Sequence, residues 1–188
     1  MPITTLDPRT ALLVIDLQAG IVRLPLAHPA DRLLERTRTL ADAFRERGLP
    51  VALVNVAGAP AGRTDRGSFD SAGLPDDFAE LVPELGAQDD DIRVTKVTAG
   101  AFSSTDLDAI LRAAGVTQVV ITGIATGSGV ESTARHAHEL GYNVVVVTDA
   151  ITDRDLATHD HSVQNVFPRM AETGTTADVL ALLATSHR

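Results

Sequence analysis

The chain has 188 residues, 44% of them hydrophobic and only 3% aromatic, so Leu, Val, Ile and Ala must fill the core of one expected domain, residues 1–188. Its formal net charge of −9 argues against nucleic acid or an anionic membrane as a partner. The absence of cysteine excludes disulfides, thiolate metal sites and cysteine nucleophiles. The chain shows neither an apolar run of about 18 residues nor a signal pattern, so we expect a cytoplasmic protein.

Residues 11–15 (ALLVI) predict a buried strand that ends at Asp16, and Gln18 begins the loop that follows. Open α/β sheets place their sites at the carboxyl ends of central strands, although an Asp there also serves as a turn or helix cap. The apolar spacing then predicts an amphipathic helix over 31–47. Residues 51–56 (VALVNV), which include Asn55, predict the second strand.

Residues 57–75 are rich in Gly, Ala, Pro and Ser and show no periodicity, which is typical of a lid or binding loop. Arg63 and Arg66 in this loop could contact an anionic substrate or lie on a solvated surface. Apolar residues between 78 and 85 predict a short helix interrupted near Pro83. The acidic run at 89–91 predicts a solvated turn rather than a metal site.

Residues 92–96 (IRVTK) predict a strand that ends in Lys96. A loop over 97–102 follows, and Thr105 is a candidate cap for a helix over 106–114. A lysine at a strand end, taken alone, is typical of the protein surface. The importance of Lys96 therefore depends on which residues the fold brings beside it.

Residues 116–150 read as a complete β-α-β unit, with strands at 119–122 and 144–147 and an apolar helical face at Val130, Ala134 and Ala137. The turn into this helix, GIATGSG, contains three glycines, so its N–H groups can converge on a carboxylate or an oxyanion. Ser128 and Glu131 also fit the capping-box spacing, which explains both without a function.

The carboxyl-terminal part predicts a polar stretch to about 161, a helix around 163–167 and a last helix over 177–184 capped by Thr175 or Thr176. We interpret four histidines as surface or interface residues: His136, His138, His159 and His161. No internal repeat and no second domain are visible in the sequence.

Strands alternating with helices predict the α/β class, a three-layer α/β/α sandwich with a central parallel sheet. Right-handed crossovers then place Asp16, Lys96 and the turn at 125–129 on one edge of the sheet. A buried lysine beside an aspartate forms an ion pair that can donate or shuttle a proton. This convergence favours a catalytic role for Lys96 over a surface role.

With these residues in place, the chain resembles the isochorismatase-like hydrolases, also called the cysteine hydrolase superfamily. The resemblance covers nearly the whole chain and rests on three segments: ALLVIDLQ, the Lys96 strand with Ala101-Phe102, and GIATGSGVESTARHAHELGYNVVVVTDA. The last segment is close to the family pattern G-[IV]-x-T-x-x-C-V-x-x-T-A. The resemblance implies the family's Rossmann-like fold, a small-molecule substrate, and a homo-oligomer that is a dimer or a tetramer.

The resemblance also implies site residues. Asp16 matches the catalytic aspartate, Lys96 matches the catalytic lysine, and Gly129 stands where amidase members have the nucleophilic cysteine. The family's amide donors would be the N–H groups of Ala125 and Gly129, with a cis peptide before the first of them. The full set of substrate-binding residues that we predict is Ala125, Thr126, Ser128, Gln18, Phe102 and Asn55.

Acyl-enzyme amide hydrolysis of the family type is excluded without a thiol at position 129. True isochorismatases, which this chain resembles in having glycine there, hydrolyse a vinyl ether. By that resemblance Asp16 would be the general acid towards the enol-ether carbon, and water would attack the resulting cation. Two alternatives remain open: an inactive member that binds a small ligand in the same pocket, and an amidase with another nucleophile, of which Ser128 is the candidate.

Two departures from the family limit the match. The glutamine that helps isochorismatases hold their substrate falls at Val56, so isochorismate itself is not implied as the substrate. The Asp-His-His metal site of nicotinamidases has no counterpart in residues 54–67, VNVAGAPAGRTDRG. We therefore expect neither a catalytic metal nor another cofactor.

Overall fold

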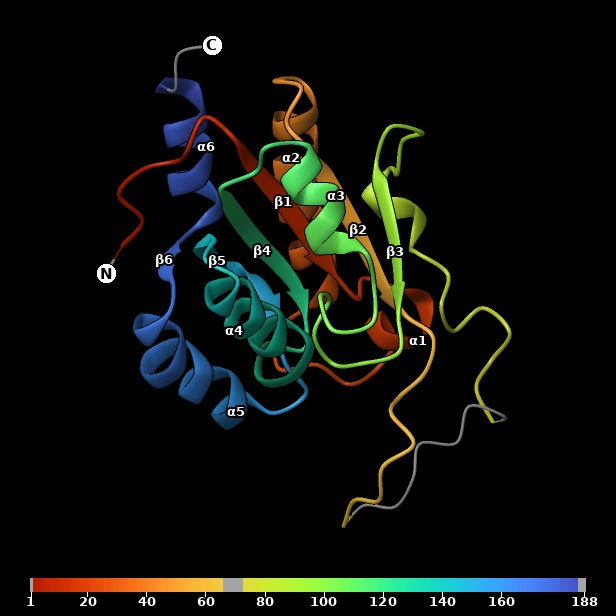
Figure 1. Cartoon of the computed structure of the whole chain (residues 1–188). Helices are drawn as coiled ribbons and strands as arrows, with labels where there is room; N and C mark the ends of the chain where they lie inside the picture. The colour runs from red at the N-terminus through yellow and green to blue at the C-terminus, as the bar shows by residue number, and fades with distance from the viewer. Residues whose placement is uncertain (1, 66–72, 186–188) are drawn as a thin grey trace.

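A six-stranded sheet, parallel throughout, forms the centre of the fold in the computed structural model, which describes residues 2–65 and 73–185. The strands follow the order β3-β2-β1-β4-β5-β6 (Figure 1). Their bounds are β1 Thr10–Ile15, β2 Val51–Val56, β3 Ile92–Lys96, β4 Gln118–Ile124, β5 Asn143–Thr152 and β6 Glu172–Gly174. This order is that of a doubly wound sheet, whose direction of winding reverses between β1 and β4.

Helices cover both faces of the sheet, which confirms the predicted three-layer sandwich (Figure 1). The α-helices are α1 Ala19–Val22, α2 Ala30–Arg45, α3 Leu107–Ala113, α4 Glu131–Glu139, α5 Leu156–His161 and α6 Thr176–Thr185. Side chains of α2 and α6 pack in one apolar cluster with one face of the sheet. Those of α3 and α4 pack in a second cluster against the other face. Within the described ranges, no helix is long and apolar enough to cross a membrane.

The two central strands are buried along their whole length, as parallel strands covered on both faces must be. Leu12 and Val14 of β1 belong to the cluster on the α2 face, whereas Leu13 and Ile15 belong to the cluster on the α4 face. The predicted bounds of β2 and β3 are confirmed. The sequence pattern therefore placed correctly the strand ends that carry Asp16 and Lys96.

The predicted helix near residues 78–85 is wrong. Residues 78–82 run instead alongside residues 17–20, through bonds from the Ala19 N–H to the Glu80 carbonyl (2.8 Å) and from the Val82 N–H to the Leu17 carbonyl (3.2 Å). Only Pro83–Leu85 is helical, as one 3₁₀ turn. A pairing between distant segments has overridden the local apolar spacing.

Two other local predictions fail because side chains find distant partners. The capping box is wrong: no side chain caps α4, and Glu131 accepts a hydrogen bond from Ser162 Oγ at 2.7 Å. Residues Thr126–Val130 form a π-helical turn there. The acidic turn at 89–91 is not fully solvated, because Asp91 is buried and pairs with Arg45 at 2.7 Å.

The carboxyl-terminal third is more regular than predicted. Strand β5 continues to Thr152, beyond the apolar run, and pairs with the end of β4 after a register shift. Helix α5 begins at Leu156, inside the stretch expected to be polar and irregular, where the Asp155 carboxylate accepts the Thr158 N–H at 3.1 Å. Thr175 is the predicted cap of α6, and its hydroxyl accepts the Asp178 N–H at 3.3 Å.

Candidate active site

Three features meet at the carboxyl edge of the sheet, beside the point where the winding reverses. Asp16 follows β1, Lys96 ends β3, and the turn Thr126–Val130 follows β4. Since β2 lies between β1 and β3, the lysine side chain has to pass the end of β2 to reach Asp16. A long, straight side chain is the residue type suited to that span. The topology therefore brings these three features to one edge of the sheet, as the sequence predicted.

Asp16 leaves β1 in a left-handed backbone conformation, with φ of 54°. Such a φ is uncommon outside glycine, and Asp is among the few residues that tolerate it. The Asp16 N–H donates to the Val54 carbonyl at 2.8 Å, which fixes the residue against β2. The chain therefore turns out of the sheet at the residue that carries the carboxylate.

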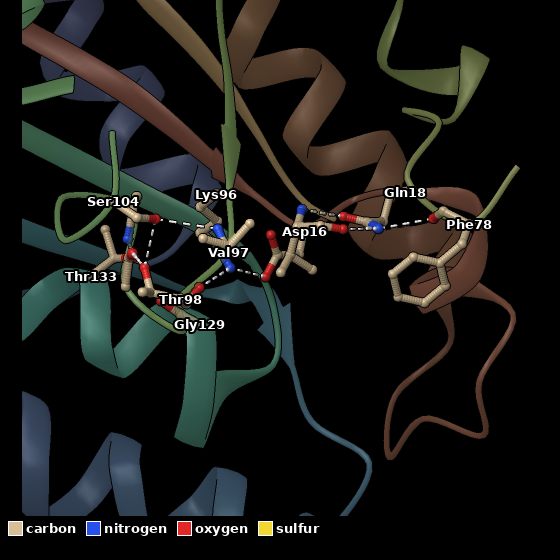
Figure 2. A network of polar contacts seen from close by, with 12 residues as sticks. Asp16, Gln18, Phe78, Lys96, Val97, Thr98, Ser104, Gly129 and Thr133 are labelled. Atoms are coloured by element: carbon tan, nitrogen blue, oxygen red, sulfur yellow. Dashed lines mark hydrogen bonds and ion pairs between the residues drawn. The ribbon is translucent and has the colours of Figure 1, made fainter. Parts of the chain in front are cut away.

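The Asp16 carboxylate and the Lys96 ammonium form a buried ion pair, with Nζ 2.8 Å from Oδ2 (Figure 2). Their side chains are 6% and 1% exposed. The ammonium also donates to the Thr98 carbonyl at 3.2 Å, so the loop after β3 holds the lysine in place. A pair this deeply buried is costly to desolvate, which makes it a candidate for a functional role.

The second oxygen of Asp16, Oδ1, is buried and has no hydrogen-bond partner among the described residues. Burial disfavours the charged carboxylate more than Lys96 favours it, and this raises the pKa of Asp16 from 3.8 to about 6. A carboxyl group with a pKa near neutrality can hold a proton and give it up. Its unpartnered oxygen is the atom through which it would do so.

Gly129 lies directly against this carboxylate. A Cβ atom at position 129 would be 2.9 Å from Asp16 Oδ2 and 3.1 Å from Ile15 Cγ2. Any side chain at 129 would therefore require the carboxylate to shift. The Gly129 carbonyl accepts the Thr133 hydroxyl at 2.6 Å, which anchors the turn on α4.

The turn itself is closed by the Ala125 carbonyl, which accepts the N–H groups of Ser128 (3.0 Å) and Val130 (3.1 Å). The peptide bond Ile124–Ala125 is cis, as the resemblance implied. Thr126 is buried, and its hydroxyl lies 2.9 Å from His159 Nδ1. The turn is thus fixed to strand β4 on one side and to α5 on the other.

The Isochorismatase domain model matches residues 10–178 of the chain. The chain belongs to the isochorismatase family. The family protein YwoC of Bacillus subtilis is 42% identical over 178 residues, covering 92% of this chain and 93% of YwoC. The solved isochorismatase family protein of Burkholderia thailandensis is 43% identical with a TM-score of 0.91, covering 96% of this chain and 98% of that one.

A solved N-carbamoylsarcosine amidase, from Thermoplasma acidophilum, is 29% identical to this isochorismatase-family chain. Its TM-score is 0.74, over 89% of this chain and 96% of that one. The family thus includes hydrolases of amide bonds as well as those after which it is named. This chain has no cysteine. That Gly129 stands at the position of the family's cysteine stays a prediction.

Gln18 and Asn55 lie at the site's edge of the sheet with their amide groups bound to other protein groups. Gln18 is fully buried, accepts the Val56 N–H (2.7 Å), and donates to the carbonyls of Val56 (2.9 Å) and Phe78 (2.8 Å). Asn55 donates to the Ala79 carbonyl at 2.7 Å. Both side chains join the sheet to the segment that returns from the 57–75 loop, and their contact with a substrate stays a prediction.

Four further residues are singled out by the sequence, and the structure describes three of them, in different surroundings. Phe102 is buried in the core on the α4 face and stacks on Tyr142, with ring centroids 5.9 Å apart. Ser128 is exposed on the turn. Arg63 is exposed, while Arg66 lies outside the described residues. The structure therefore brings Asp16, Lys96 and Gly129 together and leaves the roles of Phe102 and Ser128 as predictions.

His159 was missed as a site residue. We expected a surface or interface side chain, but His159 is only 7% exposed and contacts Thr126. In the structure His159 shares a buried helical face with Ser162 and Val166, but two of these three residues are polar, so the sequence shows no apolar stripe there. The polar stretch before them concealed the start of α5.

In the described ranges, no group of three His, Asp or Glu residues could hold a metal ion, and the absence of a cofactor stays a prediction.

Proposed function

We propose that this isochorismatase-family hydrolase cleaves a small enol ether that bears a carboxylate, by acid–base chemistry and without a covalent intermediate. Asp16 is the general acid and Lys96 its electrostatic partner. The observation that carries the proposal is the unpartnered, buried Oδ1 of Asp16, on a carboxyl group whose pKa is raised to about 6.

The proposed reaction has three steps: protonation, addition of water and collapse of a hemiketal. Asp16 donates its proton to the terminal vinyl carbon, and the ether carbon becomes an oxygen-stabilised cation. Water then adds to that cation and returns a proton to Asp16, and the resulting hemiketal collapses to a ketone and an alcohol. The enzyme is regenerated in its starting state.

Lys96 supports the first step because it faces the charge that develops on Asp16. When the acid loses its proton, the carboxylate forms the 2.8 Å ion pair with Nζ, in a site from which water is largely excluded. A fixed charge in such a site stabilises a developing charge more than it would in water. We assign the substrate's carboxylate to the N–H groups of Ala125 and Gly129, in the segment between β4 and α4.

A serine mechanism has less support. Ser128 is exposed, and no histidine or carboxylate is bonded to its hydroxyl in the part of the chain that the structure describes. Nucleophilic catalysis by serine requires such a base. The likeness to an amidase nevertheless makes amide hydrolysis by activated water a second candidate function.

The test is a substrate panel of enolpyruvyl ethers, including isochorismate, together with small amides, in which pyruvate and ammonia are measured separately. The proposal predicts pyruvate release from at least one ether. Ammonia release without pyruvate would establish the amidase alternative. No turnover, combined with a small ligand that co-purifies unchanged, would establish the alternative of a binding protein.

A further inference from the structure

The segment that follows β5 packs behind the turn Thr126–Val130 and holds it at several points. Asp153 Oδ2 accepts the Gly127 N–H at 2.8 Å. The Thr158 side chain packs so closely on Gly127 that a Cβ atom there would collide with its methyl group. Ser162 Oγ donates to Glu131 Oε2 at the start of α4. The position of the turn therefore depends on residues 153–162.

His159 makes the most deeply buried of these contacts. Its Nδ1 lies 2.9 Å from Thr126 Oγ1, and the two side chains are 7% and 0% exposed. Among the described residues, His159 is the one partner that Thr126 Oγ1 has. A buried hydroxyl hydrogen without an acceptor is costly. We therefore assign the hydrogen to a bond from Thr126 to Nδ1, which leaves the neutral ring with its proton on Nε2.

Protonation of His159 would end this arrangement. An imidazolium has a proton on both nitrogens, so Nδ1 can no longer accept, and the Thr126 hydroxyl hydrogen loses its acceptor. The bond that Thr126 donates is thus present only while the ring is neutral; in the imidazolium, Nδ1–H can only donate to Thr126 Oγ1, and the hydroxyl hydrogen must turn away. Because Thr126 begins the turn that contains Gly129, a change at its side chain reaches the backbone beside Asp16.

Burial and three neighbouring groups determine the protonation of His159. Burial and the neighbouring ring of His28, whose centroid lies 4.7 Å away, oppose the charge. Asp153 and Asp160 favour it. Burial is the largest influence, and the pKa of His159 is lowered from its ordinary value of 6.5. The ring is therefore neutral near pH 7 and gains its proton only below pH 6.5.

We propose that His159 is a positioning residue for the active-site turn, which it holds through Thr126 while its ring is neutral and releases when the ring is protonated. Its importance for turnover rests on the proposed function. The positioning does not, because it concerns the turn alone and can be observed without a substrate.

The experiment follows the Gly129 amide by ¹⁵N NMR between pH 7.5 and 4.5, together with the imidazole signals of His159. It is done in the full chain carrying Asp16→Asn, so that the titration of Asp16 does not contribute. We expect the Gly129 amide to shift with the same midpoint as the His159 ring, below pH 6.5. A second substitution, His159→Asn, which keeps a polar atom near the position of Nδ1 but does not titrate, should abolish that shift.

His28→Asn is the matched control, because it removes a neighbouring histidine that is bonded to Thr152 rather than to the turn. In His28→Asn the pH-dependent shift of the Gly129 amide should remain. Its midpoint should move to higher pH, since His28 opposes the charge on His159. If His159→Asn does not fold, Thr126→Val provides the same test from the other partner. Two results would overturn the proposal. One is a Gly129 amide shift whose pH midpoint differs from that of the His159 ring. The other is a Gly129 shift that still has the His159 midpoint in Thr126→Val.

Discussion

Lys96 Nζ contacts one oxygen of Asp16 at 2.8 Å, while the other oxygen of the same carboxylate is buried without a partner in the described part of the chain. The two oxygens of the Asp16 carboxylate thus differ in their hydrogen bonding. One is held by the ammonium, and the other is left for a reacting group. The left-handed backbone of Asp16 and the absence of a side chain at Gly129 make room for this arrangement.

The rate of turnover should fall as the pH rises through the pKa of Asp16. A general acid works only while protonated, and the pKa of Asp16 is about 6, so kcat/KM should fall about tenfold per unit of pH above 6. The measurement is a pH–rate profile on the substrate that the panel identifies. In Lys96→Met the midpoint should move to higher pH, because Lys96 lowers the pKa of Asp16. A rate that rises through pH 6 would mean that Asp16 acts as a base.

Gly129→Ala should lower turnover by at least about 100-fold, because catalytic groups must be held within about 0.5 Å of their working positions. The new Cβ would lie 2.9 Å from Asp16 Oδ2, and the carboxylate would have to move. The free energy of unfolding should also fall, by about 1–3 kcal/mol, from overpacking. Gly62→Ala is the control, since a Cβ there meets no atom within 4 Å. Steady-state kinetics and urea unfolding are measured for both variants. Equal turnover rates in Gly129→Ala and Gly62→Ala would count against a close approach of Gly129 to the reacting atoms.

Gln18→Met should destabilise the protein. The substitution preserves the length of a fully buried side chain but leaves the Val56 N–H and the carbonyls of Val56 and Phe78 without their partner. Each buried polar group left unsatisfied costs about 1–3 kcal/mol, so for three groups we expect a loss of at least about 3 kcal/mol in the free energy of unfolding. Urea unfolding measures it. A variant with unchanged stability but a raised KM would instead show that Gln18 acts chiefly on the substrate.

The sequence was sufficient to predict the four strands β1 to β4 and the pairing of Asp16 with Lys96, but not the short edge strand β6. Apolar runs marked strands β1 to β4, and parallel topology then brought Asp16 and Lys96 to one edge. The bonding of Gln18 and the burial of His159 could not be read in the same way. Each depends on a segment distant in sequence, residues 78–82 for Gln18 and the turn Thr126–Val130 for His159. Local patterns carry no information about such partners.

The most direct test of the central claim is the rate of pyruvate release by Asp16→Asn, compared with Asp91→Asn. Both substitutions remove a buried, ion-paired carboxylate, but Asp91 pairs with Arg45 at the other end of the sheet. We predict a loss of about 100- to 10,000-fold in Asp16→Asn, the usual contribution of general acid catalysis, and little change in Asp91→Asn at a temperature where both are folded. Full activity in a folded Asp16→Asn variant would contradict the proposed mechanism.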